Sequence, residues 1–189
     1  FTGVPRIFVA AEIYRKNEIQ KIQKDLLTCL NLENKYLKLV RPENFHFTLV
    51  FFGEVDNSIL DKIVTKISEI EFQSFEINFG MIGAFPNNDQ AKVVWIGLDE
   101  KTKDVFYQLS VLVMSKLEDL DLKLEKEIEK EIIPHITLFR TKKVSLSLKL
   151  PGVKSNFSIS DRIDTISVKK SMTTPQGPIY ENIISVKGK

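Results

Sequence analysis

The only two histidines of the chain each begin the same tetrapeptide pattern, His-x-Thr-Leu. Residues 46–49 read His-Phe-Thr-Leu and residues 135–138 read His-Ile-Thr-Leu. With 10 Thr and 19 Leu in 189 residues, each match has a chance of roughly one in 200. The repeat therefore indicates two segments with one shared role, and the fold has to bring them together for that role to be exercised.

Both tetrapeptides lie in segments typical of β-strands. Residues i and i+2 of a strand face the same side, so His46 and Thr48 share one face, as do His135 and Thr137. The apolar residues between them face the opposite side and can enter a core. Two such strands would place two imidazoles and two hydroxyls around one small volume.

This set of groups suits hydrolysis of a phosphodiester. Histidine titrates near neutrality, so one imidazole can act as a base while the other acts as an acid. Threonine hydroxyls can donate hydrogen bonds to the non-bridging phosphate oxygens. The plainer interpretation, ordinary strand histidines beside β-forming threonines, fits one such motif better than a pair of them.

Other reaction classes lack their motifs. Two histidines without a third His, Cys or suitably spaced carboxylate do not form a usual zinc site. The chain has no Gly-x-Ser-x-Gly elbow and no glycine-rich phosphate loop. We therefore expect neither a metal nor a cofactor.

The hydrophobic pattern alternates between strand and helix periods. It predicts helices at 16–31, from Asp56 or Asn57 to about 70, and at 102–118, and it predicts an exposed acidic stretch at 119–131. Strands are predicted at 6–13, 36–40, 45–52, 74–84, 91–98, 135–140, 144–150, 156–160, 162–170 and 179–187. Gly80 and Gly83 indicate a bulge. The order predicts an α+β fold of mainly antiparallel sheets backed by helices.

Charge, hydrophobicity and cysteine content bear on the charge of the ligand and on the cellular compartment. The net charge is only +2, but residues 141–189 carry +6 and the first 140 residues −4. The basic C-terminal quarter either attracts an anionic ligand or forms a solvated surface. No apolar run reaches the ~20 residues of a membrane span, and no signal peptide pattern begins the chain. We expect the single cysteine, Cys29, to be half-buried on a helix in a reducing compartment. We also expect a cytoplasmic monomer with no membrane association.

At this point the chain resembles a known family. Paired His-x-Thr-Leu motifs about 90 residues apart are the signature of the two-histidine (2H) phosphoesterases. Further blocks resemble the LigT-like RNA 2′,3′-cyclic phosphodiesterases, also called 2′-5′ RNA ligases, and above all their archaeal members. These blocks are residues 6–10, 44–54, 83–86, 93–97, 134–140 and 169–181. The resemblance implies a single bilobal, pseudo-twofold symmetric domain over residues 1–189, with one His-x-Thr motif from each lobe in a central cleft.

The resemblance also implies an activity. It is metal-independent opening of a 2′,3′-cyclic phosphate at an RNA 3′ end to leave a 2′-phosphate, with reversible 2′-5′ joining of tRNA halves as the related reaction. By this analogy His46 is the proton donor and His135 the proton acceptor, while Thr48 and Thr137 hold the phosphate.

Two substrate-binding residues follow from the same resemblance. Arg140 lies near the nucleobase or phosphate, although strict alternation would put it on the face opposite His135. A bulge or strand end is therefore required before it. Phe8 is a candidate platform for base stacking, or alternatively a core residue.

Two alternative functions stay open. The first is a 2H phosphoesterase acting on a small cyclic nucleotide, a 2′-5′ oligoadenylate or the oligo(U) tail of a small RNA. The second is a non-catalytic 2H domain that only binds a nucleotide. The presence of both complete His-x-Thr pairs favours an enzyme.

Overall fold

The computed structural model describes residues 4–120, 122, 133–148 and 157–189. Its helices are α1 (Lys16–Leu30), α2 (Asn57–Ser68) and α3 (Glu100–Leu117), with short 3₁₀ turns at Asn34–Tyr36, Pro42–Asn44 and Glu118–Leu120. Its strands are β1 (Arg6–Ala11), β2 (Leu37–Leu39), β3 (Phe47–Glu54), β4 (Phe75–Phe85), β5 (Val93–Leu98), β6 (His135–Thr141), β7 (Ile159–Ile163), β8 (Thr165–Thr174) and β9 (Gly177–Lys187).

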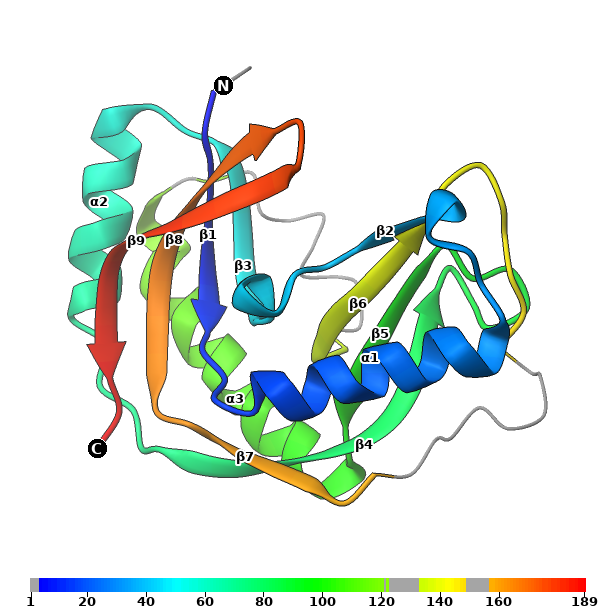
Figure 1. Cartoon of the computed structure of the whole chain (residues 1–189). Helices are drawn as coiled ribbons and strands as arrows, with labels where there is room; N and C mark the ends of the chain where they lie inside the picture. Colours follow the sequence, from blue (N-terminus) through cyan, green and yellow to red (C-terminus); the bar gives the residue numbers. More distant parts are fainter. Residues whose placement is uncertain (1–3, 121, 123–132, 149–156) are drawn as a thin grey trace.

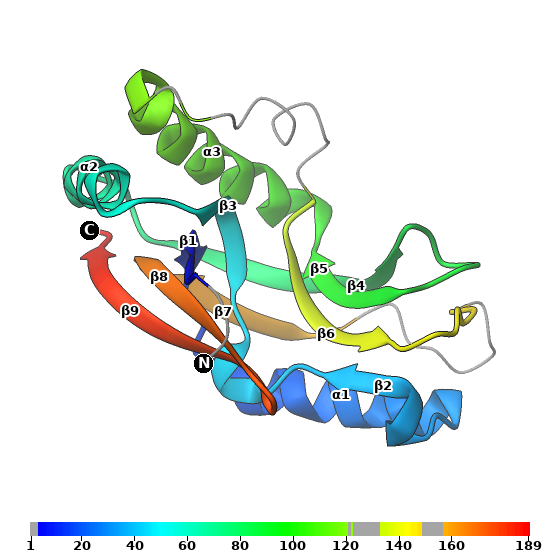
Figure 2. The ribbon, with the colours of Figure 1, turned by 90° about the horizontal axis from the view of Figure 1, so that it is seen from above.

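These strands form two antiparallel sheets. Sheet A has the strand order β3-β1-β8-β9, and sheet B has the order β2-β6-β5-β4-β7. In Figure 1 they form two lobes, with β3 and β6 on the sides that face each other. Figure 2 shows α2 and α3 on one side of the molecule and α1 on the opposite side. The predicted α+β fold with two antiparallel sheets and outer helices is confirmed.

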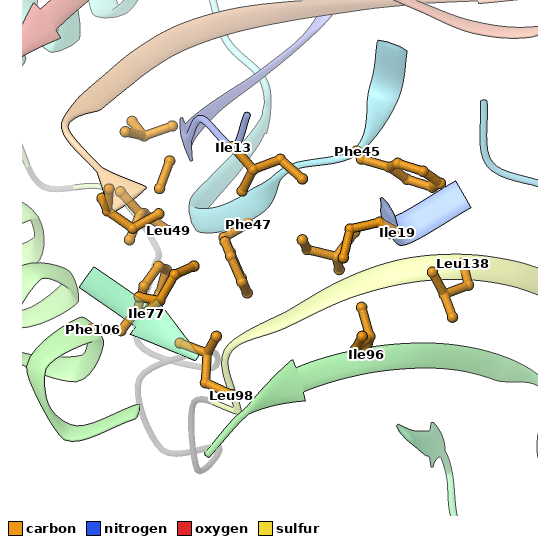
Figure 3. Packing of buried hydrophobic residues seen from close by; sticks show 14 of the residues in the cluster. Ile13, Ile19, Phe45, Phe47, Leu49, Ile77, Ile96, Leu98, Phe106 and Leu138 are labelled. Atoms are coloured by element: carbon orange, nitrogen blue, oxygen red, sulfur yellow. The ribbon is translucent and has the colours of Figure 1, made fainter. Parts of the chain in front are cut away.

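The core joins the two sheets. Figure 3 shows Phe47 of β3 beside Ile77, Leu98 and Phe106, which come from β4, β5 and α3. The ring centroids of Phe47 and Phe106 are 4.9 Å apart, and both side chains are fully buried. Because burying each such side chain contributes roughly 1.5–3 kcal/mol, this cluster holds β3 firmly against sheet B.

Helix ends agree closely with the sequence pattern. The Asp56 carboxylate accepts a hydrogen bond from the Ile59 backbone N–H at 2.8 Å, so Asp56 is the N-cap of α2. Asp99 caps α3 in the same way through Thr102, and α3 starts two residues earlier than predicted. Helix α1 ends at Leu30 and is followed by the C-cap Asn31, which adopts the left-handed conformation.

The predicted bulge in β4 lies at Gly80. Phe79 pairs with Leu98 and Met81 with Gly97, so Gly80 is the extra residue. Gly83 serves another purpose: a Cβ atom there would lie 2.3 Å from the Trp95 ring. Gly83 therefore leaves room for the indole to lie across the sheet.

The strand predicted at 144–150 is wrong for its described part. Residues 144–148 contain only an isolated bridge between Leu146 and Ala91. After β6 the chain turns, because Lys143 has a φ of 58° and the Thr141 hydroxyl donates to the Val144 carbonyl. Beyond this turn Val144 is exposed, whereas Leu146 and Leu148 pack with the core and their backbone N–H groups donate to the Ala91 and Asn88 carbonyls.

Three smaller expectations also have an outcome. The break predicted between the strands 156–160 and 162–170 falls instead at Asp164, between β7 and β8. Cys29 is exposed on α1, not half-buried. Residues 121 and 123–131 of the acidic stretch, and residues 149, 150 and 156 of the predicted strands, lie outside the described residues. No helix in the described part of the chain is long and apolar enough to cross a membrane.

Candidate active site

Both His-x-Thr-Leu motifs alternate between the core and one cleft. Their apolar members, residues 47, 49, 136 and 138, are at most 5% exposed. The other members, His46, Thr48, His135 and Thr137, all line a single cleft of about 860 Å³. Sheet A and sheet B each contribute one motif, as the alternation of strand residues requires.

Each motif carries a β-bulge at its leucine. In sheet A, Val9 pairs with Val50 and Ala10 with Thr48, so Leu49 is the extra residue of β3. In sheet B, Val94 pairs with Phe139 and Trp95 with Thr137, so Leu138 is the extra residue of β6. A bulge shifts the alternation of every later residue by one. The two motifs are therefore equivalent in backbone geometry as well as in sequence.

The bulges bring the fifth residue after each histidine into the cleft. In β6 this residue is Arg140, which lies in the cleft through the bulge that its position required. In β3 it is Phe51, an aromatic side chain that remains 39% exposed. Sequence reasoning missed Phe51. Phe51 follows His46 by five residues, as Arg140 follows His135, and this equal spacing was the sequence signal that could have identified it.

The backbone carbonyl of Leu138, at the bulge before Arg140, is hydrogen-bonded to a side chain of helix α1. The buried amide of Gln23 donates to the Leu138 carbonyl at 2.7 Å and to the Val40 carbonyl at 2.9 Å. The backbone N–H of Val40 also donates to the Leu138 carbonyl. Gln23 thus gives the Leu138 carbonyl, at the bulge, a second donor and supplies a donor to the Val40 carbonyl.

Both imidazoles are oriented by the backbone in the same way. Nδ1 of His46 lies 2.7 Å from the Asn44 carbonyl, and Nδ1 of His135 lies 2.7 Å from the Ile133 carbonyl. A carbonyl only accepts, so Nδ1 carries the proton in each ring. The lone pair of each neutral imidazole is then on Nε2. Thr48 donates its hydroxyl to Nε2 of His46 at 3.0 Å.

Asn44 also links the first histidine to the β8–β9 hairpin. Its side chain, in a residue only 9% exposed, donates to the Pro178 carbonyl at 3.0 Å. Nearby, Arg41 donates to the Gln176 carbonyl at 3.2 Å. The hairpin tip and the segment before β3 therefore form one wall of the cleft, and His46 is attached to that wall.

Each histidine packs against two aromatic rings that also contact each other. The His46 centroid is 5.0 Å from that of Phe8 and 5.3 Å from that of Tyr180. The His135 centroid is 5.0 Å from that of Phe85 and 5.9 Å from that of Trp95. The rings remove water from the imidazoles, which disfavours their charged forms.

The titration behaviour follows from this enclosure. Burial lowers the pKa of His46 to about 4, and the nearby Lys169 cation acts in the same direction. Burial also lowers the pKa of His135, with a further contribution from the charge of Arg140. In the ligand-free protein both imidazoles are therefore neutral at pH 7 and can accept a proton at Nε2.

Phe8 lines the cleft but is only 4% exposed. Its ring contacts His46 and Tyr180 instead of offering an open face. Of the two interpretations of Phe8, this burial favours packing behind the histidine over base stacking. Phe51 and the half-buried Tyr180 have the more accessible aromatic surfaces in the cleft.

The cleft is positively charged. Among its described lining residues there is no Asp or Glu, and there are five cationic side chains: Arg6, Lys38, Arg41, Arg140 and Lys142. A one-signed cleft concentrates ligands of the opposite charge. Of these five cations, only Lys142 belongs to the basic C-terminal quarter.

The arrangement combines two proton-transfer groups, two hydroxyls and a cationic wall, which suits acid–base chemistry on an anionic phosphate ester. Within the described residues, no group of three or more His, Cys, Asp or Glu side chains gathers as a metal site would require.

Comparison with known proteins agrees with this chemistry. Residues 15–95 match the family model described as LigT like Phosphoesterase. A protein of Archaeoglobus fulgidus named RNA 2′,3′-cyclic phosphodiesterase is 33% identical over 180 residues, covering 94% of this chain and 97% of the relative. One of Methanocaldococcus jannaschii with the same name is 33% identical over 185 residues, covering 94% and 98%.

Solved structures share the fold at lower identity. The structure of TT0787 of Thermus thermophilus has a TM-score of 0.76 at 22% identity, and covers 96% of this chain and 97% of that chain. E. coli LigT in its apo form has a TM-score of 0.73 at 19% identity, with coverages of 98% and 99%.

Proposed function

The chain belongs to the LigT-like 2H phosphoesterases, a family of hydrolases, and on that premise we propose that it opens the 2′,3′-cyclic phosphate at the 3′ end of RNA to leave a 2′-phosphate. The observation that carries the proposal is the meeting of both His-x-Thr pairs in one cationic cleft. The archaeal relatives, at 33% identity over nearly their whole length, bear the name of this activity.

The proposed reaction uses one imidazole on each side of the phosphorus. Water attacks the phosphorus and gives a proton to Nε2 of His135, which is neutral and has its lone pair there. The bond from phosphorus to O3′ breaks, and O3′ takes a proton from Nε2 of His46. The products are a free 3′-hydroxyl and a 2′-phosphate, so protons and bonds balance.

His46 must be protonated when it acts. In the free protein its pKa is about 4, so it acquires the proton together with the substrate, whose negative charge raises the pKa of a neighbouring imidazole. Thr48 then turns its hydroxyl from Nε2 toward a phosphate oxygen, and Thr137 donates from the opposite strand. Arg140 balances the charge that develops on the phosphate.

The same site accounts for 2′-5′ joining as the related reaction. When a 5′-hydroxyl of a second RNA replaces the water, attack on the cyclic phosphate makes a 2′-5′ phosphodiester, with the proton transfers unchanged. Because water is present at far higher concentration, we propose hydrolysis as the main activity.

The test uses a 5′-labelled RNA ending in a 2′,3′-cyclic phosphate, incubated in EDTA, with identification of the terminal phosphate formed. We expect a 2′-phosphate from the native protein and about a 10²- to 10⁴-fold loss of rate in each of His46→Ala and His135→Ala. Lys62→Gln, at an exposed position of α2, is the matched control and should retain full activity.

Three outcomes would contradict the proposal. They are a 3′-phosphate as product, full activity in either histidine variant, and binding of RNA without turnover. The last would favour the nucleotide-binding domain, and turnover of a small cyclic nucleotide in place of RNA would favour a different 2H substrate.

A further inference from the structure

The cations of the cleft are unevenly placed. Lys38 of β2 is the direct cross-strand partner of Arg140 of β6, and both side chains line the cleft. Lys142 lies two residues beyond Arg140 and lines the cleft as well. We call these three residues the cation row. It leads outward from His135 and Thr137, along β6 and one residue past its end, so it starts beside the second His-x-Thr motif and continues away from it.

The row is unfavourable in the absence of a ligand. Directly opposed residues of an antiparallel pair have Cβ atoms about 4.5–5.5 Å apart, and like charges there destabilise the sheet. Among the described residues, no carboxylate forms an ion pair with Lys38, Arg140 or Lys142. Three neighbouring cations without counter-charges form a site for a polyanion.

The charge also extends further than one phosphate needs. A single phosphate would be held by His46, His135 and the two threonines, and Arg140 is close enough to His135 to affect its pKa. Lys38 and Lys142 lie beyond that point, with a step of about 7 Å between residues 140 and 142 of an extended chain. The cleft, at about 860 Å³, is near the upper end of the ~300–1,000 Å³ typical of small-ligand sites.

We propose that the cation row is a subsite for the backbone phosphates that precede the cyclic phosphate, so that the substrate is an RNA strand of several nucleotides. This inference rests on the proposed function and specifies its substrate. Arg140 contacts the reacting phosphate or the one before it, while Lys38 and Lys142 contact the next phosphates upstream.

The test is a binding measurement that needs no turnover. Fluorescence anisotropy or calorimetry would compare adenosine 3′-phosphate with oligoadenylates of two, four and eight nucleotides that end in a 3′-phosphate, at several salt concentrations. We expect affinity to rise up to about four nucleotides and then level off. The logarithm of the binding constant should fall with the logarithm of salt, with a slope of about −0.7 for each phosphate contacted.

Variants that remove one positive charge test which residues bind the upstream phosphates. Lys38→Gln and Lys142→Gln should each weaken binding of the tetranucleotide by about threefold to tenfold and reduce its salt slope by about one phosphate contact. The loss should be smaller for the mononucleotide. Lys62→Gln removes the same charge from the exposed face of α2 and should change neither, and unchanged thermal unfolding would show that all three variants fold.

Equal affinity for one and four nucleotides, or lysine variants of the row that behave like Lys62→Gln, would overturn the inference. This failure differs from failure of the proposed function. Length-independent binding with turnover of the cyclic phosphate removes only the subsite. Length-dependent binding that the lysine variants weaken, without turnover, removes only the catalytic proposal.

Discussion

The titration of His46 offers a quantitative test of how the site is built. Its ring packs against those of Phe8 and Tyr180, and burial lowers its pKa from 6.5 to about 4. This difference corresponds to about 3 kcal/mol of free energy that opposes protonation in the folded state. The chain has only two histidines, so NMR should show two imidazole titrations, which His46→Gln assigns.

The same shift makes stability depend on pH. Above pH 6.5 His46 is neutral in both the folded and the unfolded chain, and its stabilising contribution is fully retained. As the pH falls, the unfolded chain takes up the proton first. His46 then lowers the free energy of unfolding by about 1 kcal/mol at pH 6, 2 kcal/mol at pH 5 and 3 kcal/mol at pH 4. Below pH 4 the effect levels off.

Urea denaturation of the native chain and His46→Gln at pH 7, 6, 5 and 4 measures this contribution, because all carboxylates are common to both proteins. We expect the stability of the native chain relative to His46→Gln to fall by about 3 kcal/mol between pH 7 and pH 4. A constant difference, or an NMR titration of His46 at pH 6.5 or above, would refute the argument that ring burial sets its pKa.

Three further predictions follow from other parts of the structure. Gln23→Met should destabilise the fold by about 1–3 kcal/mol, since the Val40 and Leu138 carbonyls lose the Gln23 amide as a donor. Because the Leu138 bulge positions Arg140 in the cleft, the substitution should also raise KM. In an Arg140→Ala background the KM effect should vanish, and an unchanged effect there would refute the coupling. Phe51→Leu should raise KM for RNA by about tenfold through lost base stacking. The control Phe52→Leu, at a side chain packed against the core, should leave KM unchanged. Equal effects of the two substitutions in steady-state kinetics would count against stacking. Asp56→Ala should lower stability by about 1 kcal/mol through loss of the α2 cap, as thermal unfolding can verify.

Local patterns in the sequence determine much of this protein. The alternation of residues 46–49 and 135–138 predicts which side chains are buried and which face the cleft, because strand geometry alone imposes a period of two. The Asp56 cap and the extents of α1 and α2 follow from equally local rules. These features depend on neighbours along the chain, so no tertiary information is needed to infer them.

The tertiary structure decides the rest of the site. The requirement for a bulge before Arg140 can be argued from sequence, but its position at Leu138, and the matching bulge that exposes Phe51, depend on the register with β5 and β1. The partner of Lys38 likewise depends on how β2 pairs with β6. The cleft charge comes from five positions scattered between residues 6 and 142, of which only Lys142 belongs to the basic C-terminal quarter.

The electrostatic state of the histidines is also a tertiary property. The pKa of His46 is lowered by rings and charges from β1, β8 and β9, which are far from it in sequence. Desolvation depends on everything that surrounds a group in space, whereas a motif describes only its neighbours along the chain. The sequence by itself therefore determines which groups can perform the chemistry. Only the packing of the two sheets decides the protonation state of these groups and the side chains that surround them.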